Sequence, residues 1–549
     1  MKKKNQSSAQ GDINASQFAI YNYMKKKALS YEGEMSRELK AYLHDQKKYA
    51  KRKFKTCDEL ELFVAMASSK VVYLGDFHTF DQSARNLQRI IKTLIEEKAN
   101  LILGVELVHQ EHQSYVDMYL DKLISEQELL ESINYNESWR FPWSHYREFF
   151  DLARIHGHRI LALNSQGTLS QRDQSAAEII AGQISQHPNH LFLILFGELH
   201  IMPNKLPKKV SRAFGHKLPQ TVIHQNLDDV FWELTSKHIV GESVIVKFGN
   251  NEFSIQSSPP WIKYESMIYW YDNLCEDPEF DLHDSIMQEG LKSFTSNIHD
   301  NFVYLCEHLA STLGVQCDRY ILEDFNLYDH NQISALFGKI NQNTPQKLRA
   351  YFRKLIIEGH LFHLTASNIY YCSSYSINRI SLLAGIHLLR IMAKTDDIEE
   401  KILTSSDNHA KFMFLLKRHL FAYLCSKIIN PYRKCDLYLD IKNNTKHKNI
   451  DLKKSNQIAL LFFDHIRKIR VFSKMALNRK SLRTVYLSAR IAGKAIGDAI
   501  YEKLTKEKWP SSPVLDLLTD PSNSDETLAE LLAWLYPDSS FKSKQKRLF

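Results

Sequence analysis

The stretch that decides the fold is KVVYLGDFH, residues 70–78. β-Branched and aromatic residues fill its first half and Gly75 interrupts them, which predicts a short buried strand over residues 70–74. Similar apolar runs recur later in the chain, and segments with helical periodicity separate them. The expected strands are 70–74, 100–105, 159–163, 191–196, 220–223 and 243–248, and the expected helices between them are 84–98, 145–156 and 173–186. This alternation predicts an α/β domain whose mostly parallel sheet carries helices on both faces.

The pattern changes at Pro259-Pro260, because paired prolines cannot continue a helix or a central strand. Beyond them the periodicity is helical throughout, over residues 297–313, 344–358, 377–393, 411–429, 456–474 and 481–506. We therefore predict three parts. They are a tail and leading helices over residues 1–60, the α/β domain over 61–258, and a C-terminal all-helical accessory domain over 261–549.

The helical half contains a stripe of small residues and a basic turn. Ala489, Gly493 and Gly497 recur at every fourth residue, which predicts close packing against another helix. The segment NPYRKCD, residues 430–436, places Arg433 and Lys434 directly after an expected helix end. We interpret it as a helix stop with a solvated basic flank, although a turn of this kind can also hold an anion.

Composition is that of an ordinary globular protein, with 44% hydrophobic and 24% charged residues. The net charge of +8 is small for 549 residues, and the basic runs carry no interleaved aromatic residues, so we expect no nucleic-acid partner. Scattered cysteines without CxxC spacing and the polar start of the chain favour a cytoplasmic protein. The longest apolar runs are too short for a membrane span, and a homodimer remains open.

Polar side chains follow three of the expected strands. His78 comes shortly after the first strand, Glu106 directly after the second, and His200 shortly after the strand at 191–196. Since ligands of α/β sheets bind beyond the carboxyl ends of the strands, we expect these side chains to converge there. Two imidazoles and a carboxylate suit a divalent metal ion, and they also suit general acid–base chemistry without a metal. We expect His200 to point to solvent and to contribute little to packing.

Longer motifs around these residues resemble a known family. They are VVYLGDFHTFDQSARNLQRII (71–91), LILGVELVHQEHQSYVDMYL (101–120), WRFPWSHYREFFDLARIHGHRILALNS (139–165), LSQRDQSAAEII (169–180) and LILFGELHIMPNKLP (193–207). In this order they resemble the ChaN-like haem-binding uptake domain, which is grouped with the Tiki and TraB proteins and the erythromycin esterases. The resemblance covers roughly residues 70–247.

The resemblance also assigns residues. The paired Gly-x-x-His motifs of the family fall on Gly75–His78 and Gly197–His200, and its strand-end acid falls on Glu106. As further ligand-binding residues it implies those at five matching or adjacent positions: Asp76, Asn164, Trp139, Arg172 and Glu198. Asp76 and Glu198 can be ligands or bases, or can cap the next helix. Arg172 can hold a propionate, carboxylate or phosphate, or can pair with Asp173.

Three functions follow as competing hypotheses. The first is binding of haem or another iron tetrapyrrole at the strand-end surface. The second is metal-dependent hydrolysis of the Tiki or esterase type, with His78, Glu106 and His200 holding a divalent metal ion and acting as the catalytic residues. The third is a non-catalytic regulatory role of the helical half. The sequence thus predicts a small-molecule or tetrapyrrole ligand and leaves open whether the protein is an enzyme.

Overall fold

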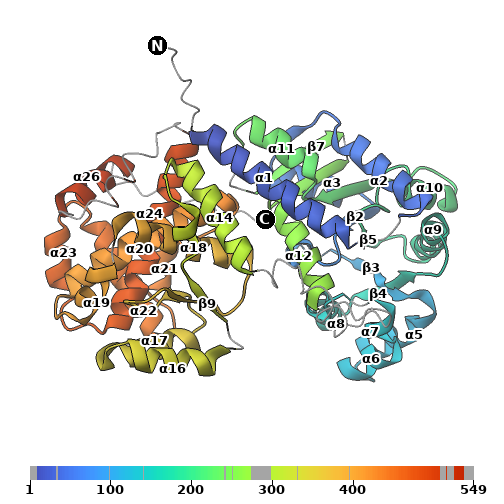
Figure 1. The fold of residues 1–549 in the computed structure, drawn as a ribbon. Helices are drawn as coiled ribbons and strands as arrows, with labels where there is room; N and C mark the ends of the chain where they lie inside the picture. Colours follow the sequence, from blue (N-terminus) through green and yellow to red (C-terminus); the bar gives the residue numbers. More distant parts are fainter. Residues whose placement is uncertain are drawn as a thin grey trace, which may run out of the picture. The chain divides into compact units, whose positions relative to one another are not determined.

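A computed structural model of the chain describes residues 9–31, 35–97, 99–139, 141–239, 243–249, 251–273, 298–329, 332–394, 396–506, 515, 518 and 525–536. The chain divides into two compact units (Figure 1): an α/β unit, which spans residues 21–293, and a helical unit, which is built from residues 1–20 and 294–546. Helix α1 (Ala9–Ser30) lies within residues 1–60, where a tail and leading helices are expected, and the first eight and last thirteen residues of the chain lie outside the described part. The domain boundaries predicted at residues 60 and 258–261 remain predictions.

The α/β unit contains an eight-stranded sheet with the order β1-β7-β8-β6-β2-β5-β3-β4. All neighbours from β8 to β4 pair in parallel, whereas β7 pairs antiparallel with both β1 and β8, so the predicted mostly parallel sheet is confirmed. The sequence did not reveal β1, because three residues are too few to show an apolar pattern. It did not reveal β8 either, because this strand follows β7 after a tight turn and has little pattern of its own. The strands are β1 (Lys55–Cys57), β2 (Val71–Asp76), β3 (Leu101–His109), β4 (Arg159–Asn164), β5 (Leu191–Gly197), β6 (Gln220–Gln225), β7 (Val244–Gly249) and β8 (Glu252–Gln256).

Helices cover both faces of this sheet because both faces of its central strands are apolar. Val72 and Leu74 of β2 pack with helices α3 (Glu59–Ala67), α4 (Asp81–Glu96) and α8 (Arg147–His156). Val71 and Tyr73 of the same strand face the other way, toward α9 (Leu169–Gln186) and α10 (Leu206–Phe214). Every residue of β2 is buried, as expected for a strand in a parallel sheet covered on both sides.

Within the described residues, eight further helical elements belong to this unit, and five of them (η1, α2, α7, α11 and α12) contribute residues to the cavity at the carboxyl ends of the strands. Helix α12 begins at Pro260, a first helical position that tolerates proline, so the paired prolines start a helix of the same unit. The elements are α2 (Arg37–Ala50), η1 (Gln110–His112), α5 (Gln113–Leu120), α6 (Glu126–Ser132), α7 (Tyr135–Ser138), η2 (Trp143–His145), α11 (Asp228–Ser236) and α12 (Pro260–Asn273).

The second unit is mainly helical, as predicted, and is centred on helix α20 (Asn408–Ile429). It also contains a three-stranded sheet, β10-β11-β9, which the sequence did not reveal: β9 (Asn326–Tyr328), β10 (Phe362–His363) and β11 (Ile369–Tyr371). Its helices are α14 (Ile298–Leu313), α15 (Arg319–Leu322), α16 (Ile333–Asn343), α17 (Gln346–Ile357), α18 (Ile377–Ala393), α19 (Asp396–Thr404), α20, α21 (Tyr438–Asn444), α22 (Ile450–Asp464), α23 (Ile469–Ala476), α24 (Leu482–Lys506) and α26 (Asp525–Leu535). The helix expected over 456–474 is divided between α22 and α23.

The small-residue stripe on α24 packs against α20, as predicted. A Cβ atom at Gly493 would lie 2.9 Å from the carbonyl oxygen of Leu416, and one at Gly497 would lie 2.6 Å from that of Leu420. Larger residues at these positions would therefore force the two helices apart.

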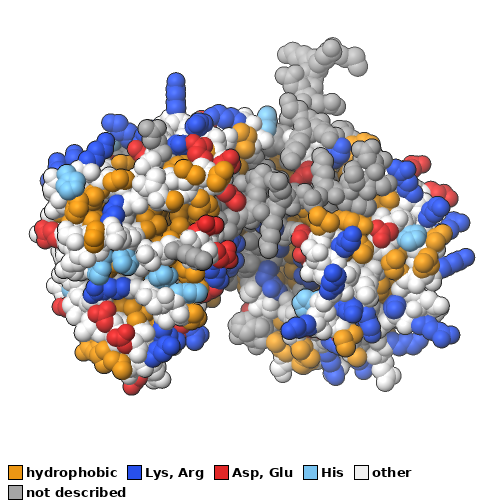
Figure 2. All heavy atoms as spheres, turned by 180° about the vertical axis from the view of Figure 1, so that it is seen from behind, with side chains coloured by type: hydrophobic (Ala, Val, Ile, Leu, Met, Phe, Trp, Pro, Cys, Tyr) orange, Lys and Arg blue, Asp and Glu red, His pale blue; other side chains and the backbone are white. Residues whose placement is uncertain are grey.

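The described helices include none that combines the length and apolar character of a membrane span. Acidic and basic side chains are interspersed over the face drawn in Figure 2, with hydrophobic side chains between them.

Candidate functional site

The carboxyl ends of three neighbouring strands bring together the side chains expected from the sequence. His78 follows β2, Glu106 lies in β3 and His200 follows β5, and these strands are adjacent in the order β2-β5-β3. Nε2 of His78 lies 3.9 Å from one oxygen of the Glu106 carboxylate, and Nε2 of His200 lies 3.9 Å from the other. Both imidazoles therefore face a single buried carboxylate.

The imidazole of His78 is oriented by a carboxylate behind it. Its Nδ1 lies 2.9 Å from Oδ2 of Asp76, which also accepts a hydrogen bond of 2.8 Å from the hydroxyl of Tyr146. Asp76 thus orients His78 and caps no helix, since α4 begins at Asp81 without a side-chain cap. Burial alone would lower the pKa of His78, but the hydrogen bond and charge of Asp76 and the charge of Glu106 outweigh it and raise this pKa above its ordinary value.

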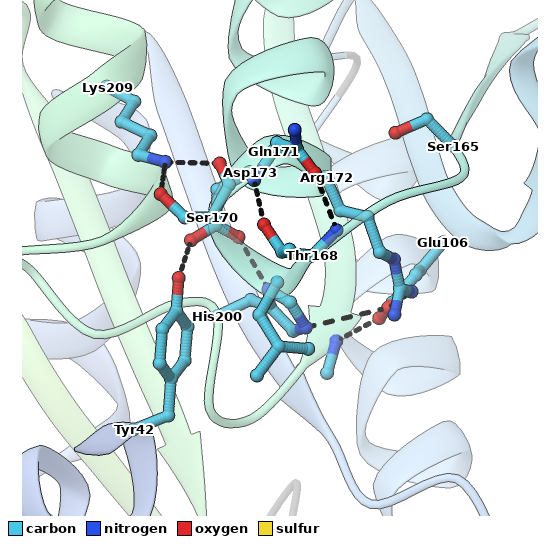
Figure 3. A network of polar contacts seen from close by, with 12 residues as sticks. Tyr42, Glu106, Ser165, Thr168, Ser170, Gln171, Arg172, Asp173, His200 and Lys209 are labelled. Atoms are coloured by element: carbon cyan, nitrogen blue, oxygen red, sulfur yellow. Dashed lines mark hydrogen bonds and ion pairs between the residues drawn. The ribbon is translucent and has the colours of Figure 1, made fainter. Parts of the chain in front are cut away.

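His200 is held in the same way by a second carboxylate (Figure 3). Its Nδ1 lies 2.5 Å from Oδ1 of Asp173, and the other oxygen of Asp173 accepts a hydrogen bond of 2.8 Å from the hydroxyl of Tyr42. His200 is 5% exposed and Asp173 is fully buried. The expectation that His200 points to solvent is therefore wrong, because the loop after β5 turns the ring inward against helix α9.

Glu106 is the common partner of these groups. Its carboxylate accepts hydrogen bonds from the guanidinium of Arg172 and, at 2.6 Å, from the backbone N–H of Gly197. Arg172 therefore pairs with Glu106, and the neighbouring Asp173 pairs with His200 instead of with Arg172. Burial would raise the pKa of Glu106, but His200, His78, Arg172 and the Gly197 N–H outweigh it and lower this pKa.

The two glycines of the Gly-x-x-His motifs lie at the ends of strands, and neither has the positive φ of a tight turn. These glycines matter because they have no side chain, which leaves room for neighbouring residues. A Cβ atom at Gly197 would lie 3.0 Å from a Glu106 oxygen and 3.3 Å from both imidazole rings, and one at Gly75 would lie 3.1 Å from Ile201. Gly197 thus permits the approach of His78 and His200 to Glu106.

Glu198 is a second buried carboxyl group at the same end of the sheet. It is 8% exposed, and its Oε1 has no hydrogen-bond partner among the described residues. Burial, opposed by the charge of Lys263 and aided by that of Asp228, raises its pKa to about 6. A carboxyl group with this pKa can gain or lose a proton near neutral pH.

A cavity of about 1260 Å³ lies in front of these residues, inside the α/β unit. Trp139, which lies edge-on to His78 with ring centroids 4.6 Å apart, and Asn164, at the end of β4, both line it. All eight residues expected at the site line the cavity: Asp76, His78, Glu106, Trp139, Asn164, Arg172, Glu198 and His200.

Helices α2 and α12 supply further walls, which sequence reasoning did not connect with the site. Leu39 and Leu43 come from α2, and Met267 and Trp270 come from α12. Lys263 of α12 donates a hydrogen bond of 2.8 Å to Asp228, which also accepts hydrogen bonds from Tyr264 and Tyr21. The amphipathic character of α2 signals a buried face but does not say that this face covers a ligand cavity.

Fold and geometry define an α/β domain with a cavity at the carboxyl ends of its parallel strands. Residues 62–172 match the family model described as "Haem-binding uptake, Tiki superfamily, ChaN", so the chain contains a ChaN-like domain there. This range holds His78, Glu106 and Arg172 and ends before Glu198 and His200. A solved structure titled "Cofacial heme binding to ChaN of Campylobacter jejuni" is 14% identical over 32% of this chain and 90% of its own, with a TM-score of 0.24. No curated protein matches the chain.

Among the described residues, no group of three or more His, Cys, Asp or Glu side chains is arranged to hold a metal ion. In the inner cluster, formed by His78, Glu106 and His200, the Nδ1 atom of each histidine is bound to an aspartate. The Glu106 carboxylate between their Nε2 atoms is already bound by Arg172 and the Gly197 N–H. The assignment of His78, Glu106 and His200 as metal ligands stays a prediction.

Proposed function

We propose that the α/β unit binds haem or a closely related iron tetrapyrrole in the strand-end cavity. The observation that carries the proposal is a cavity of about 1260 Å³ in a domain that matches a family described as haem-binding. Pockets for small molecules usually measure about 300–1,000 Å³, so this one has room for a large planar ligand.

The chemistry of the walls fits a tetrapyrrole. Leu39, Leu43, Phe141, Met267 and Trp270 offer apolar and aromatic surface for the flat ring system. Lys47 also lines the cavity and supplies positive charge for a propionate. Lys25 lines it too, but its ammonium group is already paired with Asp228 at 3.1 Å.

His78 is the residue we propose as the iron ligand. Its ring lines the cavity, and its Nδ1 is bound to Asp76, which fixes the ring orientation and increases the basicity of Nε2, as second partners of ligating histidines do. Bound haem would supply the redox and ligand-binding chemistry of its iron. Because the pKa of His78 is raised, a proton must leave Nε2 before this atom can bind iron, so affinity should increase with pH.

Hydrolysis at the inner cluster is the second candidate. Two histidines, each oriented by its own carboxylate, face Glu106 and Arg172, an arrangement suited to moving protons and holding a developing negative charge. A divalent metal ion remains part of this hypothesis, and elemental analysis of the purified protein tests it.

The experiment for haem is a titration of the purified full chain with hemin, followed by visible absorption. The wild type should show a saturable Soret shift. His78→Ala should weaken hemin binding by at least about tenfold, since loss of a good ligand bond exceeds about 1.4 kcal/mol. His216→Ala is the matched control, because His216 is exposed and lies outside the cavity. Equal hemin affinities of both variants and the wild type would show that His78 is not the iron ligand. A titration that does not saturate would show that the cavity does not bind haem.

A further inference from the structure

A cluster of cations without counter-ions lies in the helical unit, far along the chain from the strand-end cavity. Its members are Arg433, in the turn after α20, and Arg490 and Lys494, one turn apart on the same face of α24. All three are half-buried. Among the described residues none of them forms an ion pair, and the side chains of Arg490 and Lys494 also have no hydrogen-bond partner.

Side-chain contacts connect the cluster. The guanidinium of Arg433 and the ammonium of Lys494 lie 5.7 Å and 6.0 Å from the ring centroid of the same residue, Tyr423. The thiol of Cys435 lies 3.7 Å from the backbone oxygen of Lys494, which holds the turn against α24. Arg433 donates hydrogen bonds to the backbone oxygen of Asn378 and to the Ser426 hydroxyl, so its guanidinium is fixed in place.

A buried histidine adds an unused polar atom beside these cations. His419 is 8% exposed, and its Nε2 has no hydrogen-bond partner within the described part of the chain. Its ring centroid lies 4.9 Å from that of Tyr486, which lies 5.7 Å from the ring of His360. Tyr486, Arg490 and Lys494 are spaced by four residues on α24, so the histidines and the cations border one region.

The electrostatics of the groups around this region agree with a local excess of positive charge. Burial, followed by the charges of Arg490 and Arg433, lowers the pKa of Lys494 to about 7. Burial and the charges of Arg490 and Lys494 lower the pKa of His360 to about 4, although Glu358 opposes this, and hold that of His419 well below its ordinary value. Asp436 opposes the shift of Lys494, but this carboxylate is exposed.

Several other buried cations of the same unit are paired with carboxylates, unlike the members of this cluster. Lys427 pairs with Asp498 at 3.0 Å, and Arg418 pairs with Glu399 at 2.7 Å. Arg483, one helix face away, pairs with Glu358 at 2.7 Å. Half-buried cations without partners repel one another, and a bound anion relieves that repulsion.

We propose that Arg433, Arg490 and Lys494, with His419, bind a phosphate group, either as the free ion or as part of a small phosphorylated molecule. Three cations call for a group with more than one negative charge, and a phosphate group carries about −1.5 to −2 near neutral pH. Arg matches its oxygens in pairs and Lys adds a point charge, while neutral His419 can donate from Nε2. This site is independent of the function proposed for the α/β unit.

The test compares the full chain with two double variants in calorimetric titrations with inorganic phosphate, pyrophosphate and glycerol 3-phosphate at constant ionic strength. Arg490→Gln/Lys494→Gln removes two charges from the cluster. Lys453→Gln/Lys454→Gln removes two exposed charges from α22 and is the matched control. The wild type and the control should bind at least one of the three probes. The cluster variant should bind it roughly ten- to a hundredfold more weakly, the range expected for lost hydrogen bonds to a charged group. Preference for inorganic phosphate over the ester identifies the free ion as the ligand, and the opposite order identifies an organic phosphate.

The unfolding temperature gives a second measurement, in which the cluster variant should gain stability while it loses phosphate affinity. Without phosphate, the cluster variant should unfold at a higher temperature than the wild type, because charge repulsion is removed. With phosphate, the wild type and Lys494→Arg, which keeps the charge, should gain thermal stability, whereas the cluster variant should gain none. No binding by the wild type, or equal binding by both double variants, would overturn the proposal. Should the cluster variant not fold, Lys494→Gln alone takes its place in both measurements.

Discussion

Replacing His200 with alanine should destabilise the α/β unit strongly. His200 is 5% exposed, and its Nδ1 is the partner of the buried oxygen Oδ1 of Asp173, which has no other hydrogen bond from the residues that the structure describes. Leaving that oxygen without a partner should cost about 1–3 kcal/mol of unfolding free energy. The space vacated against Phe196 and Tyr42 adds a packing loss. We therefore expect at least about 2 kcal/mol, and a Tm lower by roughly 4–8 °C for a unit of this size.

His78→Ala is the matched comparison, because it removes the same side chain from the equivalent position after β2. The side chain of His78 is 24% exposed, and its partner Oδ2 of Asp76 keeps the hydrogen bond from Tyr146. This variant should cost less than about 1 kcal/mol. A smaller loss of unfolding free energy in His78→Ala than in His200→Ala would show that the burial and pairing of His200, and not the removal of an imidazole as such, cause the destabilisation.

Urea unfolding followed by tryptophan fluorescence is a suitable assay, since five of the seven tryptophans lie between residues 139 and 270. Adding Asp173→Asn in a double-mutant cycle should give a coupling energy of about 0.5–3 kcal/mol with His200. A loss below about 0.5 kcal/mol for His200→Ala, or equal losses for the two histidines, would refute the inward orientation of His200.

Three further predictions test other parts of the account. Gly197→Ala should leave the fold intact but weaken ligand binding at least about tenfold, because its Cβ would lie 3.0 Å from Glu106; hemin titration beside circular dichroism measures this, and unchanged affinity would contradict it. His224 is fully buried with its pKa lowered to about 3, so the unfolded chain gains a proton below pH 6.5 that the folded chain does not take up. Stability should fall by up to about 1.4 kcal/mol per pH unit from there toward pH 3, and less steeply in His224→Leu; equal slopes would contradict this. A fragment of residues 21–293 should unfold cooperatively while one of residues 61–258, without α2 and α12, should not; cooperative unfolding of both would favour the narrower boundary.

The strands and the strand-end residues were predictable because they depend on local pattern. An apolar run followed by Gly75 and His78, or by Gly197 and His200, specifies a strand and the side chains beyond its end. The order in which parallel strands lie is fixed by long-range packing, yet any neighbouring arrangement of these strands brings their carboxyl ends to one edge.

The partners of the site residues were not predictable, since they come from distant segments. Nothing near His200 in the sequence indicates that Asp173 lies behind it or that Tyr42 of a leading helix completes the network. Arg172 and Asp173 are neighbours in sequence, but successive side chains of a helix point in different directions, so one reaches Glu106 and the other His200. The cavity walls supplied by α2 and α12 were not predictable for the same reason, since these helices are also distant in sequence from the strand ends.

Hemin affinity of two matched leucine variants tests the central claim, that the strand-end cavity binds a tetrapyrrole. Leu43→Arg introduces a long charged side chain into the cavity wall, and Leu60→Arg introduces the same side chain at a position that is 71% exposed and does not line the cavity. We predict saturable hemin binding by the wild type and by Leu60→Arg, and affinity at least about tenfold weaker in Leu43→Arg with its fold retained. Equal hemin affinity of Leu43→Arg and Leu60→Arg would contradict the claim.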